Sequence, residues 1–343
     1  MKFDVVVGNP PYHEEDGGAQ KSARPVYQYF VKLAKSLEPE YISLIMPSRW
    51  YAGGKGLDDF RAEMLTDTHI KQLDDFLHPE EVFPTTNNRG GVCCILWSSR
   101  HNNAIDGVRV ISHEGNNIIV EAQRGMRTND LEIFIRNSES INILNKVLPT
   151  TEIPVLSQHI SPRKPFGLDG NFIRTSSFHK DAYLLESPLK CYGKAKSVGY
   201  VEKTIIDTHS EWINIWKVYF PYANNIGTEL NDDNLNTFVG EPESICTETF
   251  LFVGIDLNLN DISAANLSTY MRTRFARFLH SLAKISQHGT AKTYAFIPVQ
   301  DFTPQSDIDW TQSVPDIDRQ LYAKYGLDEQ EIAFIEEKVK PME

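Results

Sequence analysis

Residues 5–16 read VVVGNPPYHEED, in which an apolar run reaches Gly8 and an Asn-Pro-Pro-Tyr sequence follows. Residues 3–8 are almost continuously apolar, which is typical of a short strand buried on both faces of a parallel sheet. The two prolines fix their backbone φ angles and donate no N–H. The sequence therefore predicts a buried strand that ends in a rigid corner with free carbonyl groups.

The next hundred residues alternate between helix-like and strand-like patterns. The apolar spacing predicts a helix at 24–37, a strand at 41–47, a helix at 57–65 and strands at 70–76 and 90–97. Such an alternation is typical of an α/β sheet with helices packed against it.

The pattern changes after about residue 105. Short β-like runs are then separated by turns rich in Asn, Asp and Gly. Residues 263–285 form the longest helical pattern, with Ser263 as the expected N-cap, and residues 327–339 predict a terminal helix. We therefore predict two domains, at 1–110 and 111–343.

Composition sets only wide bounds. The 343 residues carry a net charge of -12, which taken alone argues against a nucleic-acid partner, although Lys and Arg can still cluster on one face. The four cysteines, Cys93, Cys94, Cys191 and Cys246, lack metal-ligand spacing, so buried free thiols are favoured over a metal site or a disulfide. Without a long apolar run or a signal-peptide pattern, a soluble cytoplasmic protein without metal is expected.

The corner has a specific chemical use. The Asn9 side-chain oxygen and the Pro10 carbonyl can accept both hydrogens of one planar amino group, and Pro11 holds the turn. Held in this way, the nitrogen lone pair leaves conjugation and can attack an electrophilic methyl group. Tyr12 offers a flat face to the ring that carries the amino group, and a base in a duplex must be flipped out to reach it. The competing interpretation is a chance turn.

DVVVGNPPY at residues 4–12 resembles motif IV of S-adenosylmethionine-dependent amino methyltransferases. YISLIMPSRWYAGG at 41–54 is similar to motif VI of the DNA adenine enzymes, and residues 74–97 look like their motifs VII and VIII. By this resemblance Asn9, Pro10, Pro11 and Tyr12 are catalytic, and Phe83 stacks on the flipped adenine opposite Tyr12. The alternative for Phe83 is a core residue between two strands.

The second half resembles the target-recognition region of Type IIG-like, adenine-specific restriction–modification methylases. The similarity rests on looser patterns, at residues 217–225, 270–279, 287–303 and 321–336. The motif order is the gamma arrangement. The resemblance implies a partial Rossmann-like methyltransferase sheet with C-terminal strands only, followed by a mixed α+β target-recognition domain, with double-stranded DNA as the partner.

Basic side chains form local groups despite the negative net charge. Such groups can bind phosphates and set the register on DNA, although a single surface Arg is often only solvated, or covers apolar surface and pairs with acids. The candidates for DNA binding are Arg89, Arg124, Arg127, Lys194, Lys196, Arg272, Arg274, Arg277, Lys284 and Lys292.

The resemblance also implies S-adenosylmethionine as cofactor, but its main binding motif does not match anywhere in the chain. In the family a Gly-rich turn precedes motif IV, and here only two residues precede the motif IV strand. The glycines of WYAGGKG at 50–56 follow a later strand. We therefore expect an N-terminal cofactor-binding half or subunit as partner, because residues 3–8 would otherwise form an exposed apolar edge.

Three functions remain open from the sequence. The first is site-specific DNA adenine-N6 methylation in a restriction–modification system, completed by the cofactor half. The second is a catalytically silent DNA-recognition module. The third is an RNA or protein amino methyltransferase, against which the long recognition-like second half argues.

Overall fold

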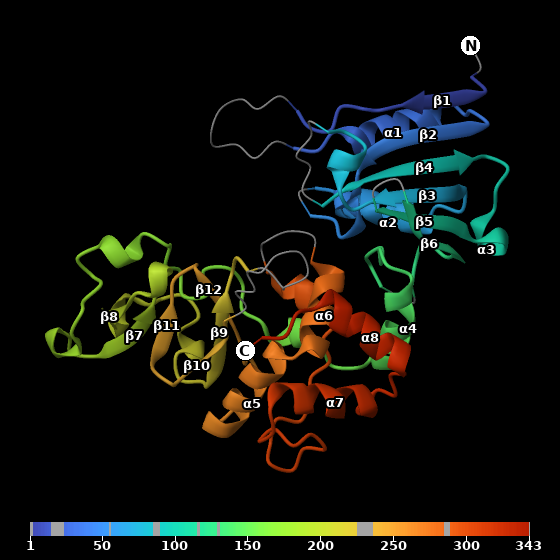
Figure 1. Ribbon diagram of the computed structural model, residues 1–343. Coiled ribbons are helices and arrows are strands. Elements are labelled where there is room, and N and C mark those ends of the chain that lie inside the picture. Colours follow the sequence, from blue (N-terminus) through green and yellow to red (C-terminus); the bar gives the residue numbers. More distant parts are fainter. Residues whose placement is uncertain are drawn as a thin grey trace. The chain divides into compact units, whose positions relative to one another are not determined.

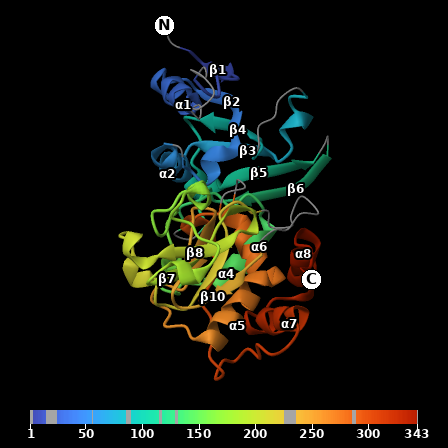
Figure 2. The same cartoon turned by 90° about the vertical axis from the view of Figure 1, so that its left-hand side faces the viewer.

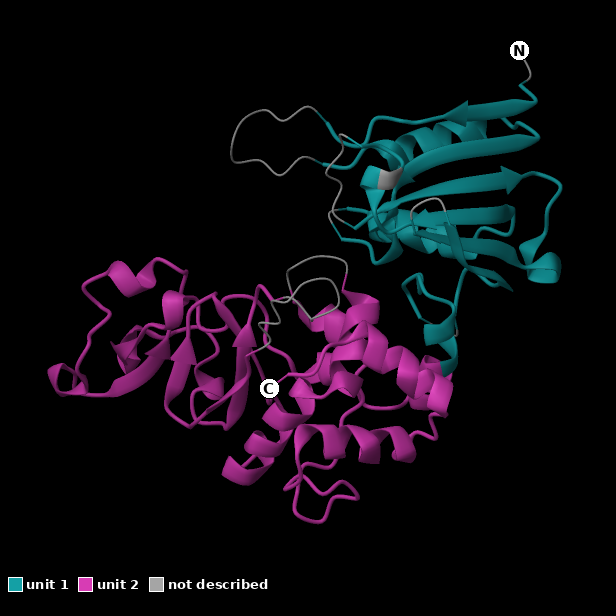
Figure 3. Cartoon of the chain, viewed as in Figure 1, with its two compact units in different colours: residues 1–142 teal, residues 143–343 magenta. Residues whose placement is uncertain are grey.

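The computed structural model describes residues 3–14, 24–54, 56–84, 90–114, 117–128, 131–224, 236–284 and 289–342. The chain forms two compact units, residues 1–142 and 143–343 (Figure 3). This division lies later than the predicted boundary at 110/111, because the two strands that follow residue 107 extend the sheet of the first unit. The division falls within helix α4 (Glu139–Val147).

Unit 1 is built on one six-stranded sheet of order β1-β2-β4-β3-β5-β6 (Figure 1). Its strands are β1 (Val5–Gly8), β2 (Tyr41–Pro47), β3 (Ile70–Phe76), β4 (Val92–Ser98), β5 (Val108–Glu114) and β6 (Asn117–Arg124). The predicted strands at 41–47 and 70–76 are confirmed, and those at 3–8 and 90–97 shift by one or two residues. Of the residues described, unit 1 also holds helices α1 (Tyr27–Ser36), α2 (Asp58–Thr66) and α3 (Asn103–Asp106).

The sheet is mixed. β1, β2, β3 and β5 run in one direction, and β4 lies antiparallel between β2 and β3. β6 pairs antiparallel with β5 at the far end. The carboxyl ends of four strands and the amino end of β4 therefore lie along one edge of the sheet, which is where the Asn-Pro-Pro-Tyr corner begins.

One face of the sheet is covered by α1 and α2, which lie on the same side of it (Figure 2). Their apolar side chains pack in one core with alternate residues of β2, β3 and β4, among them Val31, Phe60, Ile42, Leu73 and Ile95. Residues that alternate along a strand point to opposite faces, so Tyr41, Ser43 and Ile45 of β2 lie on the other face, where they are only half-buried.

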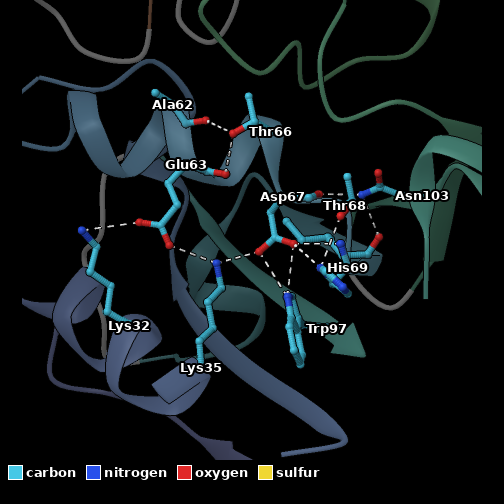
Figure 4. A network of polar contacts seen from close by, with 11 residues as sticks. Lys32, Lys35, Ala62, Glu63, Thr66, Asp67, Thr68, His69, Trp97 and Asn103 are labelled. Atoms are coloured by element: carbon cyan, nitrogen blue, oxygen red, sulfur yellow. Dashed lines mark hydrogen bonds and ion pairs between the residues drawn. The ribbon is translucent and has the colours of Figure 1, made fainter. Parts of the chain in front are cut away.

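The edge opposite the corner is held together by Asp67 (Figure 4). Its carboxylate accepts hydrogen bonds from the His69 backbone N–H and the Trp97 indole, and it pairs with Lys35 at 2.6 Å. The Asn103 side chain donates to the Asp67 carbonyl. The Asp67 side chain is 8% exposed, so one carboxylate joins α1, β4 and the turn before β3.

Unit 2 contains two small sheets and a group of helices (Figure 1). One sheet has the order β10-β9-β12 and the other β11-β7-β8. The strands are β7 (Pro188–Tyr192), β8 (Val198–Glu202), β9 (Lys217–Pro221), β10 (Phe238–Gly240), β11 (Ser244–Cys246) and β12 (Phe250–Val253). The helices are α5 (Asp261–Arg272), α6 (Arg274–Ala283), α7 (Val314–Lys324) and α8 (Glu329–Lys338).

The predicted long helix at 263–285 is two helices. Thr273 has extended backbone angles, and its hydroxyl accepts from the Ala276 N–H, so it ends α5 and caps α6. Asn260, rather than Ser263, is the N-cap of α5, and Ser263 completes a capping box with it. The buried Asp318 carboxylate accepts from the N–H groups of Arg274 and Phe275 at the start of α6.

All four cysteines are free thiols, as predicted; Cys94 is half-buried and the other three are buried. No helix within the described ranges is both long and apolar enough to cross a membrane.

Candidate active site

The Asn-Pro-Pro-Tyr corner directly follows β1, as predicted. Asn9 is exposed, Pro10 is buried and Pro11 is exposed. The Tyr12 carbonyl accepts from the Val26 N–H, which ties the corner to the start of α1. Asn9 therefore stands at the edge of the sheet where β1 ends. The backbone of the corner is joined to β1 on one side and bonded to the start of α1 on the other.

Tyr12 is half-buried, and its hydroxyl has no hydrogen-bond partner among the described residues. Burial raises the pKa of Tyr12 to about 12, and the neighbouring Cys93 adds to the effect. Burial likewise raises the pKa of the Cys93 thiol to about 12, so both groups are neutral at physiological pH. Tyr12 thus offers a neutral aromatic ring beside a closed apolar core.

Phe83 lies on the connection between β3 and β4 at the same edge of the sheet, and it is half-buried. Its N–H donates to the Pro79 carbonyl in the short 3₁₀ turn Pro79–Glu81. β2 and β4 lie between β1 and β3, so three strand spacings separate the strand ends by roughly 14 Å. The fold places Tyr12 and Phe83 on one edge, and the stacking role of Phe83 stays a prediction.

A buried polar cluster lies at this edge that the sequence analysis did not identify. Asp75, 2% exposed on β3, accepts hydrogen bonds from the Tyr51 hydroxyl at 2.9 Å and from Ser48 at 3.2 Å. The Arg136 guanidinium pairs with Asp75 at 2.8 Å, lies over the Tyr51 ring and donates to the Gly90 carbonyl. Arg136 thereby fixes both ends of the connection that carries Phe83.

The sequence held one signal for this cluster. Within the strand pattern at 70–76, Asp75 shares a face with Leu73, which is fully buried. A carboxylate at a core position needs a partner. Its partner Arg136 is 61 residues away, beyond any local pattern.

The glycines at 53–56 do not form a cofactor site. Gly53 has φ +73°, and a Cβ there would meet the Arg61 guanidinium at 2.1 Å. Arg61 is buried and donates to the Ala52 carbonyl and to Asp58. This turn therefore holds a structural arginine and does not offer an open glycine-rich turn to a cofactor.

β1 is the open edge of the sheet among the described residues, since it pairs with β2 alone. Val5 is 51% exposed and Val7 is 74% exposed. The prediction that residues 3–8 form a strand buried on both faces is therefore wrong for the described residues. On α1, Tyr29 and Leu33 are also exposed. An open strand edge with exposed apolar side chains is a template for pairing with another segment.

The predicted basic groups are distributed unevenly. Arg277 is fully buried and donates to the Lys340 carbonyl, so it packs inside unit 2 and does not face DNA. Arg274 pairs with Glu336, and Arg124 lies over Phe134 and donates to the Ile135 carbonyl. The packing of α6 turns Arg277 inward, whereas Arg274 at the start of that helix is half-buried, and Arg124 lies at the end of β6 in unit 1.

The remaining candidates are spread over both units. Lys196, Arg127 and Lys292 are exposed. Half-buried Lys194 bonds Asn171, and half-buried Lys284 donates to the Asn224 carbonyl. Arg272 is half-buried at the end of α5, and Arg89 lies outside the described residues.

Sequence comparison identifies the class of the first quarter of the chain. Residues 1–83 match the family described as Eco57I restriction-modification methylase, which confirms the resemblance drawn from the NPPY corner. An uncharacterized adenine-specific methylase of Mycoplasma pneumoniae (strain ATCC 29342 / M129 / Subtype 1) is 32% identical over 104 residues. The match covers 29% of this chain and 25% of that relative, so the chain spans about a quarter of the relative's length.

Solved restriction–modification enzymes are distant neighbours. The type IIG restriction endonuclease BpuSI matches at a TM-score of 0.36 and 12% identity, covering 98% of this chain and 53% of that one. The Type IIL enzyme MmeI, solved in complex with DNA, matches at 0.47 and 8% identity, covering 97% and 56%.

Proposed function

We propose that this chain provides the adenine-holding corner and the DNA-recognition part of a methyltransferase that modifies adenine at N6 in DNA. The enzyme uses S-adenosylmethionine and acts in a restriction–modification system. The observation that carries the proposal is the exposed Asn9 on a fixed corner after β1, within the stretch that matches the methylase family. Unit 2 is the proposed target-recognition domain.

The proposed roles follow from the corner. The Asn9 side-chain oxygen and the Pro10 carbonyl accept the two amino hydrogens of a flipped adenine, and Pro11 keeps the corner rigid. Tyr12 stacks on one face of the base, and Phe83 covers the other. The neutral state of Tyr12 at physiological pH supports a stacking role over one in proton transfer.

The methyl donor requires polypeptide beyond the described residues. When bound, S-adenosylmethionine supplies an electrophilic methyl group to the adenine nitrogen. We propose that a cofactor-binding half, on the same or another chain, pairs with the open edge of β1. The exposed Val5 and Val7 support this placement.

The test is Asn9→Ala in the chain co-expressed with the polypeptide encoded directly upstream. We expect methylation of adenine in duplex DNA to fall by at least about a hundredfold, because one positioned hydrogen-bonding group is lost at the reacting atom. DNA binding should be unchanged. The control is Asn117→Ala, an exposed Asn at the start of β6. Full methylation by Asn9→Ala would remove the proposed role of the corner.

The second candidate function is a catalytically silent DNA-recognition module. The poor fit of the Gly53 turn to a cofactor favours it. It predicts that the wild-type pair binds DNA sequence-specifically but transfers no methyl group. Radioactive methyl transfer to DNA by the wild-type pair separates the two functions.

A further inference from the structure

An open surface hollow of about 350 Å³ lies in unit 2, where strand ends from both small sheets meet. Tyr222 directly follows β9, Glu248 lies between β11 and β12, and Lys194 follows β7. Arg163 and Asn171 come from the long connection before β7. The five side chains supply hydrogen-bond donors, acceptors and one aromatic face.

Arg163 is held on two sides although its side chain is 56% exposed. Its guanidinium lies over the Tyr222 ring, 4.9 Å from the centroid, and pairs with Glu248 at 2.9 Å. The other Glu248 oxygen accepts from the Gly170 N–H at 3.0 Å, so the carboxylate is itself anchored. A guanidinium held in this way loses little conformational freedom when it binds a planar partner.

Backbone strain gathers around the same hollow. Lys164, next to Arg163, has φ +57°, and the consecutive residues Ala195 and Lys196 have φ +55° and +58°. Residues other than glycine rarely adopt this region, and such conformations cluster at ligand-binding sites. Lys194 donates to the Asn171 side-chain oxygen at 2.7 Å across the hollow. The strained residues therefore directly follow Arg163 and Lys194, which both line the hollow.

We propose that this hollow reads a guanine in the major groove of DNA, with Arg163 as the reading residue. The inference rests on the DNA-recognition role proposed for unit 2. A guanine presents two acceptors, O6 and N7, that match the two parallel N–H groups of an arginine. Tyr222 and Glu248 are positioning residues, because they act on the base through Arg163.

The charge in the hollow favours a base edge over a backbone phosphate. Glu248 faces the site with a side chain that is 21% exposed, and a carboxylate repels a phosphate. A base pair presents acceptors and donors together, and the cytosine opposite a guanine offers an amino donor. Lys164, whose side chain is 46% exposed and pairs with Glu248 at 3.8 Å, is the basic side chain next to Arg163 that a neighbouring phosphate would meet.

The experiment selects binding sites for the full chain from a random library of double-stranded DNA. With wild-type protein we expect an enriched sequence that contains at least one fixed guanine. With Arg163→Gln one guanine position should become degenerate, with a loss of roughly ten- to a hundredfold in discrimination there. Arg163→Lys should lose as much, since an ammonium lacks the paired N–H geometry. Arg319→Gln, an exposed arginine on α7, should keep the wild-type sequence.

A chemical probe tests the same contact on the wild-type protein. Replacing that guanine by 7-deazaguanine deletes N7, so wild-type affinity should fall, and Arg163→Gln should lose nothing further. Tyr222→Phe should restore what Tyr222→Ala loses, because the ring supports Arg163. Circular dichroism melts check that each variant is folded.

The outcomes separate this inference from the proposed function. A wild-type chain that selects no sequence would overturn both the DNA-recognition role and the guanine reading. An unchanged sequence with Arg163→Gln would overturn the guanine reading alone. A uniform loss of affinity for all sequences, with a weaker salt dependence, would make Arg163 a phosphate contact and would also overturn it.

Discussion

At the residue scale, the ring and the hydroxyl of Tyr12 have different proposed roles, which two substitutions can separate. Its hydroxyl is buried and unpaired among the described residues, and the side chain as a whole is half-buried. We therefore expect Tyr12→Phe to retain methylation within about threefold. Tyr12→Ala should lose about 1–3 kcal/mol of binding to the flipped base, as for other base–aromatic stacks. Fluorescence of 2-aminopurine placed at the target adenine, with methylation rates, measures both.

The same pair of variants tests the competing interpretation of Tyr12 as an acid or base. If Tyr12→Phe abolished methylation while DNA binding persisted, the hydroxyl would have a chemical role and the stacking assignment would fail. The raised pKa of Tyr12, about 12, predicts no inflection from this group in the pH profile below pH 10.

At the element scale, the start of α6 depends on the buried Asp318. Burial raises the pKa of this carboxyl to about 6, against which two backbone hydrogen bonds act. Because the folded value lies above the ordinary 3.8, the stability that the protonated form gives is complete below pH 3.8 and is lost as the pH rises through 6. A rise from 3.8 to about 6 corresponds to about 3 kcal/mol.

Asp318→Asn measures this effect, since the amide cannot titrate. Subtracting the variant's free energy of unfolding from that of the wild type cancels all other titrating groups. We expect this difference to fall by up to about 3 kcal/mol between pH 4 and pH 7 in urea unfolding followed by circular dichroism. A difference that is flat across this range would show that Asp318 keeps an ordinary pKa.

At the scale of the whole molecule, the open edge of β1 bears on how activity is completed. We expect residues 1–343 alone to bind no S-adenosylmethionine in calorimetry, because the Gly53 turn is filled by Arg61. Val7→Asp should leave the chain's stability within about 0.5 kcal/mol, since Val7 is 74% exposed. A charge on the edge should nevertheless weaken association with the upstream polypeptide at least tenfold.

Ile105→Asp is the matched control for that association, because Ile105 is 81% exposed on α3 of the same unit. Pull-down and methylation assays of the two variants distinguish a paired edge from a general effect of added charge. Tight binding of S-adenosylmethionine by the isolated chain, or equal association by both variants, would refute the proposed partner surface.

Local patterns were sufficient for most elements of unit 1. The strands at 41–47 and 70–76 follow from short apolar runs between turn signals. The NPPY corner can be recognised in the sequence because its residues are consecutive. The helix at 263–285 was predicted as continuous because Thr273 does not interrupt the apolar spacing. The N–H group that the break leaves on Arg274 is bonded by Asp318, which lies 45 residues beyond Thr273 in the chain.

The sequence by itself determined the candidate chemistry of the corner, from residues 4–12, and the similarity of residues 1–83 to the Eco57I restriction-modification methylase family. Tertiary structure alone decided which charges face water. It buried Arg277, paired Asp75 with Arg136, and brought Arg163, Tyr222 and Glu248 to one hollow. The physical reason is that the chemical type of a side chain determines which partners it can bind. Contacts between segments that are distant in the sequence determine whether that side chain is accessible to those partners.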